Sequence, residues 1–191
     1  MPSGLLWGRT NLGTIDEYGL GSYFSWGNVD GHNASDHANF DDDYNFGSSN
    51  EGVYSQTPGS LIQSNLDPNN PLEDAARAML GGNWQIPTKE MFQELFNNTD
   101  SEWINDYMGT GISGRKFMRK SNHSIYIFLP AGGEGFATGL LHFNEQGQYW
   151  SASYIDENQA SNFHFNSLSV TPVDSTQRFR GRNIRPVKYR N

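Results

Sequence analysis

About a third of the chain consists of residues that favour turns, yet the chain is also rich in aromatic side chains. Its 191 residues include 21 Gly, 20 Asn and 19 Ser, together with 12 Phe, 9 Tyr and 5 Trp. Disordered chains are poor in aromatic residues, so this chain is expected to fold. The combination predicts a loop-rich structure around a small aromatic core, and the length favours one domain over residues 1–191.

Composition and charge exclude several classes of function. Without cysteine the chain has no disulfide, no thiolate metal site and no cysteine nucleophile. The net charge of −8 disfavours nucleic acid or an anionic membrane as a general partner, and no apolar run approaches the ~18 residues of a membrane span. Residues 1–110 carry 3 basic and 16 acidic groups, and residues 111–191 carry 10 and 5, so the two halves are expected to pack together.

Two stretches have the end signals and apolar spacing of helices. The first is expected to begin at Asn70-Pro71 and to end at Gly81-Gly82, with an apolar stripe that includes Met79 and Leu80. The second is expected over 89–98, with Thr88 as its N-cap and with Asn97-Asn98 at its end.

Short strands are expected at 116–119, 124–129, 149–153, 162–166 and 184–189. Side chains alternate between the two faces of a strand. Phe163 and Phe165 should therefore face the core, whereas Asn162, His164 and Asn166 should face solvent.

The motifs that usually carry catalysis or metal binding are weak here. The acidic stretch with His32, His37 and Asp30, Asp36, Asp41, Asp42 and Asp43 matches no calcium-loop spacing, and a solvated acidic loop is the preferred interpretation. No nucleophile elbow and no His-Glu-x-x-His motif occurs, so we predict no catalytic residue, no metal and no cofactor. The basic segment with Arg178, Arg180, Arg182 and Arg185 is interpreted as internal, neutralising the acidic half.

Several blocks spread over the chain resemble one family. The most specific are Gly82-Asn83-Trp84-Gln85-Ile86-Pro87-Thr88 and Tyr149-Trp150-Ser151-Ala152-Ser153. In order and spacing they resemble the bacterial "major paralogous domain" surface proteins. The resemblance implies an α+β, C-type-lectin-like fold of the formylglycine-generating-enzyme type, with two helices, a small, mostly antiparallel twisted sheet and long loops. It also implies that sequence upstream of Pro2-Ser3-Gly4 supplies a further strand. Those enzymes need active-site cysteines, so the resemblance carries fold and not catalysis.

Residues 149–187 also resemble the variable region of target proteins of diversity-generating retroelements, in which Asn codons are the usual targets of mutation. The chain keeps the apolar frame of that region at Trp150, Phe163 and Phe165, although Glu157 and Gln159 do not fit the mutated-codon pattern. The resemblance and the expected outward positions imply these ligand-binding residues, with Tyr154 and Phe179 as aromatic anchors: Tyr154, Asp156, Asn158, Asn162, His164, Asn166, Ser167, Ser169, Thr171, Asp174, Ser175, Thr176, Phe179 and Arg180.

The sequence therefore predicts a non-enzymatic, receptor-type binding protein on a cell surface, secreted or on a virion. Its expected partner is a protein or glycan on another cell or particle, and the oligomeric state is left open. Two alternatives remain: an undiversified adhesin or glycan-binding domain of a cell surface or pilus, and an enzyme like the formylglycine-generating enzymes.

Overall fold

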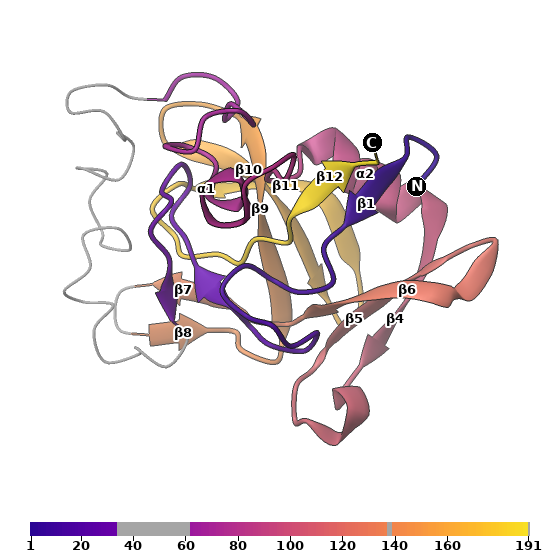
Figure 1. Cartoon of the computed structure of the whole chain (residues 1–191). Coiled ribbons are helices and arrows are strands. Elements are labelled where there is room, and N and C mark those ends of the chain that lie inside the picture. The colour runs from indigo at the N-terminus through magenta and orange to yellow at the C-terminus, as the bar shows by residue number, and fades with distance from the viewer. Residues whose placement is uncertain (34–61, 137–138, 191) are drawn as a thin grey trace.

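Antiparallel strands dominate the computed structural model, which describes residues 1–33, 62–136 and 139–190 (Figure 1). Strands make up 42% of the described residues and helices 12%. The strands form several small sheets, and the prediction of an α+β, C-type-lectin-like fold with one small twisted sheet is therefore wrong. The chain is mostly β because stretches without a clear apolar alternation also pair as strands.

The elements follow one another in a simple order along the chain. They are β1 (Leu5–Trp7), β2 (Ser22–Tyr23), β3 (His32–Asn33), α1 (Ala75–Leu80), α2 (Lys89–Asn98), β4 (Thr99–Ile104), the 3-10 helix η1 (Tyr107–Gly109), β5 (Gly114–Arg119), β6 (Asn122–Pro130), β7 (Glu134–Phe136), β8 (Gly139–Leu141), β9 (Gln146–Tyr154), β10 (Gln159–Asn166), β11 (Val170–Gln177) and β12 (Val187–Tyr189). Two three-stranded sheets have the orders β4-β5-β6 and β11-β10-β9, and the other strands pair as β1-β12, β2-β3 and β7-β8.

The two helices differ in how well their ends follow the sequence signals. Thr88 caps α2 as predicted, because its side chain accepts a hydrogen bond from the Met91 amide. The predicted start of α1 is wrong: the helix begins at Ala75, and Asp74 is its N-cap. The predicted apolar stripe of α1 also continues too far, because Met79 and Leu80 are half exposed while Ala75 and Ala76 are buried.

All five predicted strands are present, although most extend beyond the expected residues and the last begins later, at Val187. The sequence analysis did not predict the other seven strands in the described part of the chain, of which β4 and β11 are the longest. Both have polar sequences, and β11 contains Pro172. Proline is tolerated at the edge of a sheet, and β11 is an edge strand of its sheet among the described residues.

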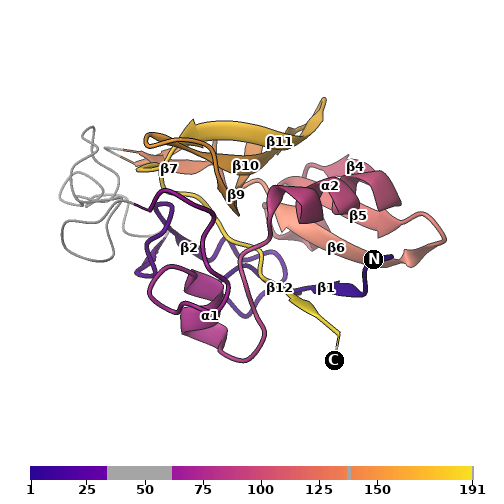
Figure 2. The ribbon, with the colours of Figure 1, turned by 90° about the horizontal axis from the view of Figure 1, so that it is seen from above.

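The two ends of the chain are brought together by the pairing of β1 with β12, which both views show (Figures 1 and 2). Nearby, the buried guanidinium of Arg185 donates hydrogen bonds to Asn11 Oδ1 at 2.9 Å and to the carbonyl oxygens of Gly8, Arg9 and Phe128. The predicted packing of the two halves is thus confirmed at this place.

The internal interpretation of the basic segment holds for Arg178, Arg182 and Arg185, all of which are buried. Their partners differ from the expected ones. Arg178 and Arg185 donate mainly to main-chain carbonyls, and Arg182 pairs with Glu134, which also belongs to the basic half of the chain.

Two clusters of buried apolar residues form the core. One surrounds Trp26 and Trp150, and the other joins Phe92 and Leu95 of α2 to Phe117, Phe163 and Phe165. None of the helices in the described part of the chain has the length and apolar character required to cross a membrane.

Candidate functional site

The predicted binding residues lie on or near the sheet of β9, β10 and β11. Phe163 and Phe165 of β10 are fully buried, as predicted. They face α2, which covers one side of this sheet (Figure 2). Phe163 and Phe165 of the apolar frame therefore lie on the side of the sheet that packs on α2, whereas Trp150 is buried on the opposite side, in the register position beside Asn162.

The other face of β10 is much less exposed than predicted. Asn162 was expected to face solvent, but its side chain is only 1% exposed. It lies between Trp150 of β9 and Asp174 of β11 in the register of the sheet, and the Arg182 guanidinium lies over the Trp150 ring at 5.3 Å. The prediction for Asn162 is wrong because the segment that follows β11 returns to cover this face. His164 and Asn166 are partly buried.

A charged cluster lies beside this covered face. Glu134 of β7 accepts hydrogen bonds from Arg180 Nη1 at 2.7 Å and from Arg182 Nη2 at 2.8 Å, and Arg182 also donates to Thr176 Oγ1 at 3.0 Å. Burial lowers the pKa of Arg182 to about 10, although the carboxylate of Glu134 opposes this shift. The guanidinium groups of both arginines are thus held by the fold, so Arg180 is not a free side chain.

Phe179 was predicted to be an aromatic anchor for the ligand, and this is wrong. Its side chain is only 6% exposed and packs on Phe136, with ring centroids 6.0 Å apart. The Arg180 guanidinium lies over the same Phe136 ring at 4.5 Å. Tyr154, the second predicted anchor, is partly buried against Trp26 and the Arg178 guanidinium.

Two of the predicted residues shape the turns that connect the strands. Asp156 Oδ1 accepts hydrogen bonds from the amides of Asn158 and Gln159 in the β9–β10 turn, both at 2.8 Å. In the β10–β11 turn, Asn166 Oδ1 accepts from the amides of Leu168 and Ser169 at 2.8 and 2.9 Å. Such side-chain bonds to the local backbone favour one turn conformation, so these residues have a structural role.

Twelve of the fourteen predicted residues are at least partly accessible. The exposed ones are Asp156, Asn158, Ser167, Ser169, Asp174 and Ser175, and the partly buried ones are Tyr154, His164, Asn166, Thr171, Thr176 and Arg180. The sequence analysis did not predict three exposed apolar side chains, which lie on β11 and on the β9–β10 and β10–β11 turns. Ile155, Leu168 and Val173 are 40%, 92% and 41% exposed. Leu168 could have been predicted to be exposed, because it is an apolar residue within a stretch of turn-forming residues.

Beneath this surface, several polar atoms have no hydrogen-bond partner in the part of the chain that the structure describes. They include Asn162 Oδ1, His164 Nε2 and Ser161 Oγ, all on β10. Burial lowers the pKa of His164, although the nearby carboxylate of Asp174 opposes this shift. The lowered pKa favours the neutral form of the imidazole, which remains partly accessible.

The candidate cation site falls largely outside this structure. Asp36, His37, Asp41, Asp42 and Asp43 lie outside the described residues. Among residues 1–33, 62–136 and 139–190, no group of three or more acidic or His side chains is placed to hold a metal ion.

Comparison with known proteins adds no relative. No family model, no curated protein and no solved structure, with a C-type-lectin-like fold or any other, matches the chain. The function is therefore argued from the residues and the geometry.

Proposed function

We propose that the chain is a receptor-type binding protein that contacts its ligand with the exposed residues of β11 and of the β9–β10 and β10–β11 turns. We call this the β11 surface, and it consists of Ile155, Asp156, Asn158, Ser167, Leu168, Ser169, Val173, Asp174 and Ser175. The proposed ligand is a protein or glycan on another cell or particle, and the proposed setting is a cell surface, a secreted protein or a virion.

One observation carries this proposal: along β10 and its neighbours, the apolar frame is buried and most of the intervening polar residues are accessible. Phe163 and Phe165 point into the core, whereas Ser167, Ser169, Asp174 and Ser175 are exposed. A rigid sheet that displays small polar residues and a few apolar ones suits recognition, because polar groups provide hydrogen bonds and apolar side chains provide contact area.

The resemblance to variable regions of diversity-generating retroelements supports diversification of this surface. A diversified position must accept many side chains, and exposed positions do so at little cost to stability. We expect variation to concentrate at Ser167, Ser169, Thr171, Asp174 and Ser175, which are exposed or half-buried.

A second candidate is an undiversified adhesin. It is favoured because five of the predicted binding residues have structural roles in the fold. Asn162 and Phe179 are buried, Arg180 is bonded to Glu134, and Asp156 and Asn166 hold turns. Free substitution at these five positions would disturb the local structure. Variation that spares all the predicted positions would point to this second candidate.

Deep sequencing of the 3′ end of the gene in its source population separates the two. Diversification predicts substitutions at the codons of the exposed residues, with Phe163 and Phe165 unchanged. An invariant region would contradict diversification and leave the adhesin.

Binding itself is tested by exchanging one exposed serine for a large cation. The full chain and Ser175→Arg are applied to glycan arrays and to cells from the source community. A matched variant, Ser121→Arg, places the same side chain on an exposed serine in the β5–β6 turn. We expect Ser175→Arg to lose binding and Ser121→Arg to keep it, both with an unchanged melting temperature. Equal binding by the two variants would contradict the proposed surface.

A further inference from the structure

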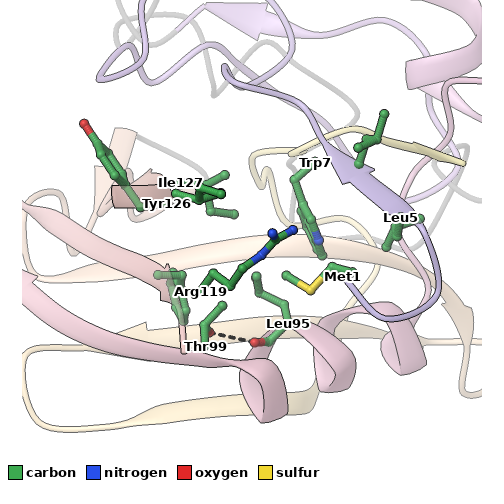
Figure 3. A pocket seen from close by; sticks show the side chains of 11 residues that line it. Met1, Leu5, Trp7, Leu95, Thr99, Arg119, Tyr126 and Ile127 are labelled. Carbon is green, nitrogen blue, oxygen red and sulfur yellow. Dashed lines mark hydrogen bonds between the residues drawn. The ribbon is translucent and has the colours of Figure 1, made fainter. Parts of the chain in front are cut away.

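A pocket lies away from the β11 surface, between β1, α2 and the β5–β6 hairpin (Figure 3). Its volume is about 230 Å³. The apolar lining includes the buried Leu5, Leu95 and Phe117 and the less buried Trp7 and Ile127. None of the fourteen predicted binding residues lines it, so its function is separate from the surface described above.

Two polar groups at this pocket, the Arg119 guanidinium and the Trp7 indole N–H, are hydrogen-bond donors only. The Arg119 side chain extends from β5 toward the pocket and toward Trp7 (Figure 3). Within the described residues, the Arg119 guanidinium makes no ion pair or side-chain hydrogen bond, and no acidic residue lines the pocket. The buried indole Nε1 of Trp7 also has no acceptor in the described part of the chain.

The two hydroxyl groups at the pocket already have partners. Thr99 Oγ1 donates to the carbonyl oxygen of Leu95 at 2.6 Å, which Figure 3 marks with a dashed line, and the Tyr126 hydroxyl lies 3.2 Å from the hydroxyl of Tyr107. The pocket thus combines apolar walls with an exposed cation, Arg119, and the buried Trp7 N–H group, neither of which has an acceptor among the described residues. The buried Trp7 donor is costly to leave without an acceptor, whereas the exposed Arg119 is solvated and offers a ligand its positive charge.

We propose that this pocket binds a small amphipathic carboxylate, with its apolar part against Leu95, Phe117 and Ile127 and its carboxylate on Arg119. Arg119 supplies charge complementarity, because arginine forms charge-assisted hydrogen bonds with carboxylates. Pockets for drug-sized ligands begin at about 300 Å³, so a pocket of about 230 Å³ suits a single ring or a medium-length acyl chain. Exposed Ile125 and Tyr126 lie at its rim, at 48% and 39% exposure.

Three ligands of equal chain length test the charge preference on the unmodified protein. Octanoate, octanol and octylammonium are titrated into the full chain by isothermal titration calorimetry. We expect octanoate to bind at one site and at least about tenfold more tightly than octylammonium, since a charge-assisted bond is worth roughly one factor of ten or more in affinity. Equal affinities for the three ligands, or no octanoate binding in the low millimolar range, would overturn the proposal.

Variants then locate the site. Arg119→Gln should weaken octanoate binding about tenfold and leave octanol binding unchanged. The matched control is Arg190→Gln, because Arg190 is also exposed and lies outside this pocket. The Trp7 indole N–H resonance, assigned with Trp7→Phe, should shift when octanoate binds.

Loss of octanoate affinity in both arginine variants, or an unshifted Trp7 resonance, would contradict binding at this pocket. Ser175→Arg should not change octanoate binding, so failure of the β11 surface and failure of this pocket can be told apart.

Discussion

Phe163 of β10 stacks face to face on Phe92 of α2, with ring centroids 4.6 Å apart and ring planes 6° apart. Both side chains are fully buried. The ring centroid of Phe163 also lies 5.6 Å from that of Phe117 of β5, so the Phe163 ring contacts α2 and connects the two three-stranded sheets. The β11 surface therefore depends on a residue that points away from it.

Phe163→Ala should lower the free energy of unfolding by about 3–5 kcal/mol, because it removes a buried ring and leaves a cavity. Urea denaturation measures this loss. Leu168→Ala is the control, since Leu168 is 92% exposed and its truncation should change stability by less than about 0.5 kcal/mol. Similar losses in both variants would contradict this account of the core.

Glu134→Gln should destabilise the protein by about 3 kcal/mol, because it leaves the buried Arg182 cation without its carboxylate. The control is Glu145→Gln, whose side chain is 71% exposed and whose loss should change the free energy by less than about 0.5 kcal/mol. Thermal and urea unfolding of both variants are compared at neutral pH. A variant at position 134 as stable as the wild type would show that the pair is not needed.

Asp74 should make stability depend on pH in an unusual direction. Burial raises the pKa of this carboxyl to about 6, although hydrogen bonds from the amides of Arg77 and Ile86 oppose the shift. The folded state then holds a proton more tightly than the unfolded state, so the contribution of Asp74 is full below about pH 4 and is lost as the pH rises through about 6.

Asp74→Asn keeps a capping side chain and removes this titration. The stability of the wild type relative to the variant should fall by up to about 3 kcal/mol between pH 4 and pH 7. Urea denaturation of both proteins across this range provides the measurement. A difference that stays constant with pH, or grows as the pH rises, would show that the pKa of Asp74 is not raised.

Asn166→Ala should cost about 1 kcal/mol of stability, because the β10–β11 turn loses the acceptor of the Leu168 and Ser169 amides. Ser167→Ala in the same turn removes an exposed side chain and should leave the melting temperature unchanged. Differential scanning calorimetry distinguishes the two. If the variants behaved alike, the turn would not depend on Asn166.

Local signals predicted what depends on near neighbours in the chain. The cap at Thr88 is one example, because its partner is the amide three residues later. The strand with Phe163 and Phe165 is another, since alternation alone assigns the two rings to one face. Signals of this kind did not extend to β4 and β11, whose residues are mostly polar and show no clear apolar alternation, although each pairs with a strand next to it in the chain.

By itself, the sequence determined that the chain folds around aromatic residues, that α2 begins after Thr88 and that the frame of β10 is buried. Only the tertiary structure decided that the chain is mostly β, that Asn162 and Phe179 are buried and that Arg119, which has no ion-pair partner among the described residues, lies at an apolar pocket. Capping and alternation are local properties of a chain, whereas burial of a polar side chain depends on which distant segment covers it. Asn162 is buried because residues after β11 return over it, and no spacing within β10 carries that information.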